Sequence, residues 1–148
     1  MVVSNVKKGR ATDSPKDELR LVDAVLAAFC FQSENHKLHQ PLNVQAVYKA
    51  FAELRQQHLT WLQDLQFTYG PADAVPISGT LEDILFDLGA SGIMAVENPW
   101  YKYLKIKPSK LKLIKEKITR RRSESEQEEL RRLADGFLDQ YSKIAEKR

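Results

Sequence analysis

Two histidines, His36 and His39, stand three positions apart beside Glu34, and on a helical backbone they could share a metal ion. A structural zinc site needs four protein ligands, and a catalytic site needs three together with a water. The third histidine, His58, lies in a different segment, on an apolar face, where we expect it to be half-buried. The ligand count therefore favours a solvated loop, and the sequence predicts no metal and no cofactor.

Three acids, Glu82, Asp83 and Asp87, raise the question of a catalytic carboxylate pair, because Asp83 and Asp87 are one helical turn apart. General acid–base catalysis also requires a pocket and perturbed pKa values, which a sequence does not show. Thr80 precedes these acids, and acidic residues favour the N-terminus of a helix. We interpret them as residues of a helix start. With no nucleophile elbow, phosphate loop or dinucleotide fingerprint present, the sequence predicts a protein that is not an enzyme.

Cys30 is the single cysteine, so no intrachain disulfide can form, and a reducing, cytoplasmic location is expected. It stands between Phe29 and Phe31, and we interpret it as a small buried hydrophobe and not as a nucleophile. No segment approaches the ~20 consecutive apolar residues that a membrane span needs, so no membrane partner is predicted.

Residues 102–122 give the strongest functional signal. They hold ten lysines and arginines and one glutamate, a balance of +9, so the rest of the chain carries −6 within the total of +3. Aromatic residues alternate with the first lysines, which suits nucleic acid because cations neutralise phosphates and aromatic rings stack on bases. A strand edge protected by lysines would show the same pattern. The candidate nucleic-acid contacts are Trp100, Lys102, Lys105, Lys107, Lys110, Lys112, Arg120, Arg121 and Arg122.

The elements that must position these groups lie over residues 80–106. Apolar residues at helical spacing predict a helix over 80–91, with Thr80 as its cap and Gly92 directly after its end. Residues 93–96 and 100–106 flank Glu97-Asn98-Pro99, which is typical of two strands joined by a turn. A helix that leads directly into a small hairpin is the shape of a winged helix. The predicted fold is therefore mainly α with a small β-hairpin.

This helix is poorly suited to reading DNA. In a helix-turn-helix protein the recognition helix carries Arg, Lys, Asn or Gln toward the bases. Here the helix over 80–91 contains three acids and neither lysine nor arginine, so it would repel phosphates. Any contact with nucleic acid should come from the hairpin and the helix that follows it.

Two further helices are predicted before this unit. Ser14 and Pro15 begin the first, which should run to about Phe31. Asn43 caps a second and longer helix, which proline and glycine must end before the turn Tyr69-Gly70-Pro71.

Two more helices follow the hairpin. Pro108 begins a basic helix that reaches residue 122, and Ser125 with Glu128 forms a capping box for the last helix. We expect a flexible tail at 1–14, a winged-helix-like domain at 15–108 and a C-terminal helical extension at 109–148. The apolar stripe of the last helix must be buried in this domain or against another chain. It supplies the candidate protein interface, Leu130, Leu133, Phe137, Leu138, Tyr141 and Ile144.

An aromatic–Tyr-Gly-Pro turn precedes a leucine-rich helix that ends in glycine and leads into a hairpin. The residues of this pattern are Phe67-Thr68-Tyr69-Gly70-Pro71, Leu81, Leu85, Leu88, Gly92-Ile93 and the segment through Ile106. Over residues 19–118 the arrangement resembles small bacterial winged-helix proteins of the YwgA-like and Panacea-like kind. The resemblance implies an adaptor or regulator in a toxin–antitoxin or antiviral defence locus.

Two functions stay open. The first is a non-enzymatic winged-helix adaptor that binds another protein or a second copy of itself, indicated by the acidic helix and the unassigned apolar stripe. The alternative is a regulator that contacts DNA or RNA through residues 102–122. We expect the first, because the acidic helix is a specific objection to groove reading, whereas a basic patch has several causes.

Overall fold

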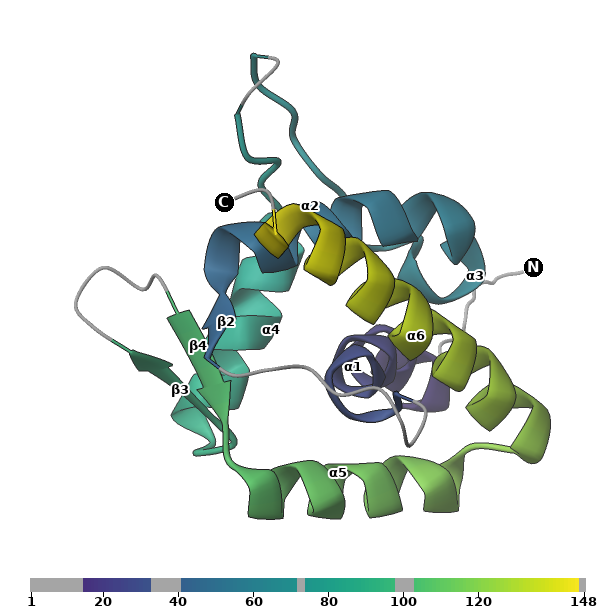
Figure 1. Cartoon of the computed structure of the whole chain (residues 1–148). Coiled ribbons are helices and arrows are strands. Elements are labelled where there is room, and N and C mark those ends of the chain that lie inside the picture. The colour runs from purple at the N-terminus through teal and green to yellow at the C-terminus, as the bar shows by residue number, and fades with distance from the viewer. Residues whose placement is uncertain (1–14, 33–40, 72–73, 98–102, 147–148) are drawn as a thin grey trace, which may run out of the picture.

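The computed structural model describes residues 15–32, 41–71, 74–97 and 103–146, whose arrangement Figure 1 shows. Three predicted features lie outside these residues: the tail 1–14, the loop with His36 and His39, and the hairpin tip with Trp100 and Lys102. The elements in chain order are α1 (Pro15–Cys30), β2 (Leu42–Asn43), α2 (Val44–Gln57), α3 (Leu59–Leu62), α4 (Gly79–Ala90), β3 (Met94–Glu97), β4 (Tyr103–Ile106), α5 (Pro108–Arg121) and α6 (Glu124–Glu146).

Helix α1 begins and ends close to the positions that apolar spacing and caps predict, and helix α2 begins where its cap predicts. Helix α1 ends at Cys30, against the predicted end at about Phe31. Helix α2 begins after Asn43, whose side-chain oxygen accepts a hydrogen bond of 2.9 Å from the N–H of Ala46. This bond satisfies one of the backbone donors that a helix start leaves free. The predicted cap at Asn43 is confirmed.

The single long helix predicted across α2 and α3 is wrong, because the chain bends at His58. His58 has φ −128° and ψ 51°, outside the helical region. Its N–H donates to the carbonyl of Leu54 and closes α2, while its own carbonyl accepts from the N–H groups of Trp61 and Leu62. The bend keeps Trp61, Leu62 and Leu65 in the core. The same apolar spacing therefore fits two short helices as well as one long helix.

Helix α4 is capped by Ser78, two positions before the predicted cap Thr80. Ser78 is buried, and its Oγ accepts a hydrogen bond of 3.1 Å from the N–H of Leu81. The Ser78 carbonyl also accepts from the N–H of Glu82, which is a backbone bond of the first turn. The earlier cap brings Gly79 and Thr80 into the helix, so Thr80 is not its start.

The predicted end of this helix at Gly92 is confirmed. Gly92 has φ 82°, a left-handed conformation that glycine adopts without steric cost. The N–H of Ile93 donates to the carbonyl of Leu88, and the N–H of Gly92 donates to the carbonyl of Gly89. These two bonds form a Schellman motif, which turns the chain directly into β3.

The small sheet has three strands in the order β2-β4-β3. The predicted hairpin is present as the antiparallel pair β3–β4, with Met94 opposite Ile106. The third strand, β2, was not predicted, because two residues are too few to show an alternating pattern. It pairs with the other edge of β4, with Leu42 opposite Leu104. The fold is mainly α with a small β-hairpin, as predicted, and α4 leads directly into the hairpin.

A capping box joins α5 to α6, but it uses Ser123 and Glu126 instead of the predicted Ser125 and Glu128. The Ser123 Oγ accepts from the N–H of Glu126 at 3.2 Å, and the Glu126 Oε1 accepts from the N–H of Ser123 at 3.0 Å. The sequence contains the Ser-Xaa-Xaa-Glu pattern twice with an offset of two residues. Only the first copy stands at the corner between the two helices.

The apolar stripe of α6 packs inside this chain, against α1 and α2 (Figure 1). The Phe137 ring centroid lies 5.5 Å from that of Phe29 and 4.7 Å from that of Phe51. The predicted protein interface on this stripe is therefore wrong, since its central members are core residues. Buried members are Leu130, Leu133, Phe137 and Tyr141, and half-buried members are Leu138 and Ile144.

Two contacts hold α6 close to β2 and α2. The Tyr141 hydroxyl accepts a hydrogen bond of 2.8 Å from the N–H of Asn43 in β2. At Gly136 a Cβ atom would lie 3.0 Å from the Leu54 side chain, so glycine lets α6 approach α2 closely. Residues of α5 and α6 thus share one hydrophobic core with the domain predicted over 15–108.

Candidate interaction surfaces

A buried ion-pair cluster holds the C-terminal end of α5 against α1. Asp23 lies within the apolar stripe of α1 and is fully buried. Its Oδ2 accepts from the Nε of Arg122 at 2.8 Å and from the Nε of Arg121 at 3.0 Å, and its Oδ1 accepts from a terminal nitrogen of Arg121. Hydrogen bonds to Asp23 are the main cause that raises the pKa of Arg121. Such pairing is what makes a buried carboxylate tolerable in an apolar surrounding.

Trp61 of α3 completes this cluster. The guanidinium carbons of Arg20 and Arg122 lie 4.6 Å and 5.3 Å from the ring centroid of Trp61. The indole N–H donates to Glu129 of α6 at 2.9 Å. Cation–π attraction and this hydrogen bond join α1, α3, α5 and α6 at one corner of the molecule.

Two predicted nucleic-acid contacts therefore have structural roles. Arg122 is only 3% exposed and cannot reach a ligand in solution. The Arg121 side chain is 36% exposed and already carries its Asp23 partner. The prediction of nucleic-acid contact is wrong for Arg122, and the Asp23 pairing removes Arg121 from the free cations.

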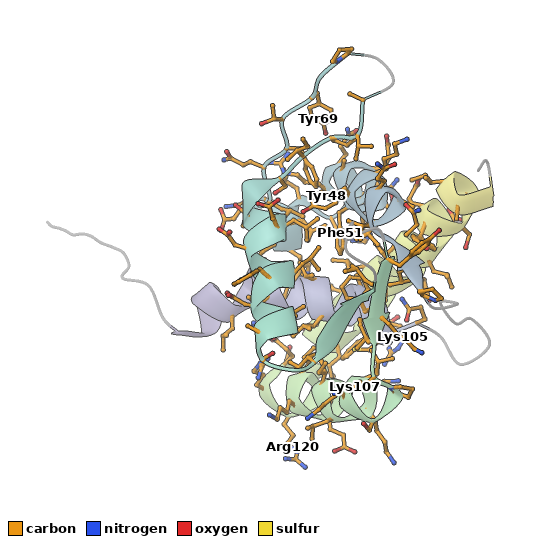
Figure 2. The ribbon with its side chains drawn as sticks, turned by 90° about the vertical axis from the view of Figure 1, so that its left-hand side faces the viewer. Tyr48, Phe51, Tyr69, Lys105, Lys107 and Arg120 are labelled. Carbon is orange, nitrogen blue, oxygen red and sulfur yellow. The ribbon has the colours of Figure 1, made fainter. Side chains whose placement is uncertain are left out.

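The other cations of this segment form a surface that we call the basic surface: Lys105, Lys107, Lys112, Lys117 and Arg120. All five are exposed, and no ion pair joins any of them to another residue in the part of the chain that the structure describes. Figure 2 shows Lys105 and Lys107 along the strand that leads into α5, and Arg120 at the lower edge of α5.

Two further lysines of α5 are placed differently. Lys110, a predicted contact, is half-buried at the first turn of the helix. Lys115 was not among the predicted contacts, and its ammonium lies 5.9 Å from the ring centroid of Phe31. Neither is counted in the basic surface, because Lys110 is half-buried and Lys115, although exposed, has its ammonium over the Phe31 ring.

A second charged surface is the outer face of α4, formed by Glu82, Asp83, Phe86 and Asp87. The apolar face of the helix, with Leu81, Leu85 and Leu88, is buried. Phe86 points away from that face and is 74% exposed, with Glu82 and Asp83 one turn before it. Phe86 was missed in the sequence, although it lies off the leucine stripe at helical spacing.

The acids of this face act on a neighbouring helix. Burial, and to a smaller extent the charges of Glu82 and Asp83, raise the pKa of Tyr48 in α2 to about 12. Figure 2 shows Tyr48 beside α4, toward its N-terminal end. Tyr48 on α2 is therefore close enough to the α4 face to be affected by its negative charges.

Cys30 and His58 are the remaining candidates for chemistry, and both are partly buried. Cys30 is half-buried and not, as expected, fully buried, and burial raises the pKa of its thiol to about 12. His58 is half-buried, as expected, and burial lowers its pKa. Across the described ranges, no three His, Cys, Asp or Glu side chains come together as metal ligands. Of the helices that the structure describes, none has both the length and the apolar character needed to cross a membrane.

Comparison with known proteins adds no assignment. No protein-family model matches this chain, and no curated protein and no solved structure is significantly similar to it. The resemblance to YwgA-like and Panacea-like proteins therefore stays a prediction from the sequence pattern.

Proposed function

We propose that this protein is a non-enzymatic winged-helix adaptor that binds a partner protein through the outer face of α4. The observation that carries the proposal is Phe86, an aromatic side chain 74% exposed in the middle of an acidic helix face. Aromatic residues are enriched in protein interfaces and often contribute most of their binding energy. The proposed interface thus lies on α4, and not on the α6 stripe.

The charges on this face define the chemistry of the partner. Glu82, Asp83 and Asp87 are exposed and lie on the same side of α4 as Phe86. A complementary surface would carry lysine or arginine around an apolar contact, because opposite potentials steer association and select partners. We propose a basic, amphipathic helix of a partner protein as the occupant, since two helices pack through interdigitated side chains.

The same charges make α4 unsuitable as a DNA-reading helix. A recognition helix enters the major groove between two rows of phosphates. Helix α4 carries acids and no lysine or arginine along its whole length. Phosphates would repel this helix, whereas a basic protein surface would attract it.

Photo-crosslinking in cells of the source organism tests the proposal. A photoreactive amino acid replaces Phe86 in one variant and Leu59 in a control, because Leu59 is also an exposed apolar residue but lies on α3. We expect an adduct with a second protein from position 86 only. Its yield should fall at least about tenfold when Glu82→Lys and Asp83→Lys reverse the charge of the face.

Three outcomes would contradict the proposal. The first is the absence of any adduct at position 86, and the second is the same adduct at positions 86 and 59. The third is an adduct with twice the mass of this chain, which would indicate self-association.

A further inference from the structure

We infer that the basic surface is a second, independent binding site that holds the phosphate backbone of a nucleic acid through β4 and α5. Its members are the five exposed cations Lys105, Lys107, Lys112, Lys117 and Arg120. Figure 2 shows Lys107 and Arg120 low in the molecule, whereas the acidic helix α4 rises above them. The two surfaces can therefore carry opposite charges without cancelling each other.

The spacing of these cations suits a polymer of phosphates. From Lys112 to Arg120 the helix rises by about 12 Å, at ~1.5 Å per residue. Duplex DNA carries a negative charge for each ~1.7 Å of its axis, so several phosphates lie opposite this part of α5. Lys105 and Lys107 continue the row of cations along the strand that leads into the helix.

The structure argues against two other anionic partners. A helix that lies on a membrane inserts an apolar face among the lipids. The apolar face of α5, with Ile114 and Ile118, is already buried in the core of this chain. An acidic protein would need apolar anchors at the centre of its interface, and α5 offers only Leu113 in an exposed position.

Binding should be insensitive to base sequence. Lysines contact phosphates as point charges, and base-edge recognition requires a helix or a strand ribbon inside a groove. Helix α4 carries acids and no lysine or arginine, so phosphates would repel it from a groove. The basic surface therefore neutralises the backbone, and its affinity should depend steeply on salt.

Fluorescence anisotropy with a short labelled DNA duplex, titrated with salt, tests this site on the full-length protein. The test variant carries Lys112→Gln, Lys117→Gln and Arg120→Gln. Each lost phosphate contact should reduce the magnitude of the salt slope by roughly 1. The loss of affinity between about 50 and 200 mM salt should then become roughly 40-fold smaller than in the wild-type protein, at ~0.9 per contact.

A matched control removes the same charge from α6, with Arg131→Gln, Arg132→Gln and Lys143→Gln. These three side chains are exposed and lie on a different helix. The control, the charge-keeping variant Lys112→Arg/Lys117→Arg and Phe86→Asp should all retain binding and its salt slope. Since Phe86→Asp alters only the α4 face, failure of this site and failure of the proposed adaptor function are distinguishable.

Several results would overturn the inference. One is undetectable duplex binding at low salt, and another is an equal loss of binding in the α6 control. Equal affinity for polyglutamate, or for vesicles of anionic lipid, would assign the surface to an acidic protein or to a membrane instead.

Discussion

The two ends of the basic run 102–122 differ in what their cations do. At the N-terminal end Lys105, Lys107 and Lys112 are exposed and have no ion-pair partner within the described residues, and the same holds for Arg120, directly before the other end. At the other end Arg121 and Arg122 are bound to Asp23, and Arg122 is buried. Neighbouring arginines in the sequence thus have opposite roles. A run of like charges alone does not show which of its members are available to a ligand.

The difference arises from the last turn of α5 and from one acid on α1. Asp23 is in hydrogen-bonding contact with residues 98 and 99 positions later in the chain. Arg120 lies on the outer side of the same turn and is exposed. Successive helix residues are rotated by about 100°, so Arg121 faces Asp23 on α1 while Arg120 faces the solvent.

Removing Asp23 should have the largest effect, because it takes away the carboxylate that pairs with the buried end of the run. Asp23→Ala leaves Arg122 buried without this carboxylate, and we expect a loss of about 3–5 kcal/mol in the free energy of unfolding. Arg120→Ala should change it by less than ~0.5 kcal/mol. Urea unfolding followed by circular dichroism measures both.

The double variant Asp23→Ala/Arg122→Met serves as the control for this prediction. It removes both charges, so it should be more stable than Asp23→Ala alone. A double variant less stable than Asp23→Ala would show that the pairing is not the source of the effect.

Trp61→Phe should cost about 1–2 kcal/mol, because it removes the hydrogen bond to Glu129 and weakens the attraction to two arginines. This variant perturbs the surroundings of Arg122 without changing any charge. Leu59→Ala on the same short helix is the control, and it should be nearly neutral because Leu59 is exposed. Equal losses in the two variants would contradict a specific role for Trp61.

The corner that turns Arg122 inward depends on the capping box of α6. Ser123→Ala should therefore destabilise the protein by about 1 kcal/mol, whereas Ser125→Ala should be close to neutral. Thermal unfolding of the two variants measures the difference. The reverse order would support the cap at Ser125 that the sequence predicts.

Salt should distinguish the exposed end from the buried end by a few tenths of a kcal/mol. Repulsion among exposed lysines is screened by salt, so added sodium chloride should stabilise the wild-type protein. This gain should shrink in the variant Lys112→Gln/Lys117→Gln/Arg120→Gln. It should persist in the matched triple variant on α6, and an equal change there would argue against local repulsion on α5.

The smallest predicted effect is a change of stability with pH that depends on His58. Burial disfavours the protonated form of this side chain. Its folded pKa is lowered below 6.5 by burial, so the unfolded chain binds more protons. Stability should be fully present above pH 6.5 and decrease as the pH falls through the lowered pKa of the folded state. His58→Gln should flatten this part of the curve of unfolding free energy against pH. An unchanged curve would mean that His58 makes no contribution to it.

Features that depend on a few neighbouring residues could be predicted from the sequence. The cap at Asn43 and the helix end at Gly92 belong to this group, because their bonding partners lie within five positions. Where two overlapping signals compete, the sequence cannot choose between them. Ser78 and Thr80 are both possible caps of α4, and Ser123 and Ser125 are both possible caps of α6. The packing around each helix start determines which residue is used.

Long-range contacts could not be predicted. Strand β2 forms only because Leu42 meets Leu104, and the stripe of α6 could have packed on this chain or on another. The burial of Arg122 depends on Asp23, which reads in the sequence as one acid within an apolar stripe. Phe86 could have been found, since it lies outside the leucine stripe of α4. The sequence thus predicts which segments are charged, but it does not predict which residues in each segment are exposed.

The bond between Tyr141 and Asn43 has a consequence for how the chain can be shortened. Strand β2 lies at an edge of the sheet, and open edges allow strands of other molecules to add on. The Tyr141 hydroxyl accepts the hydrogen bond of the Asn43 N–H in this strand. Helix α6 therefore covers this edge and hinders the addition of another strand. Truncation before Tyr141 would expose core residues and this edge together, and the product should self-associate.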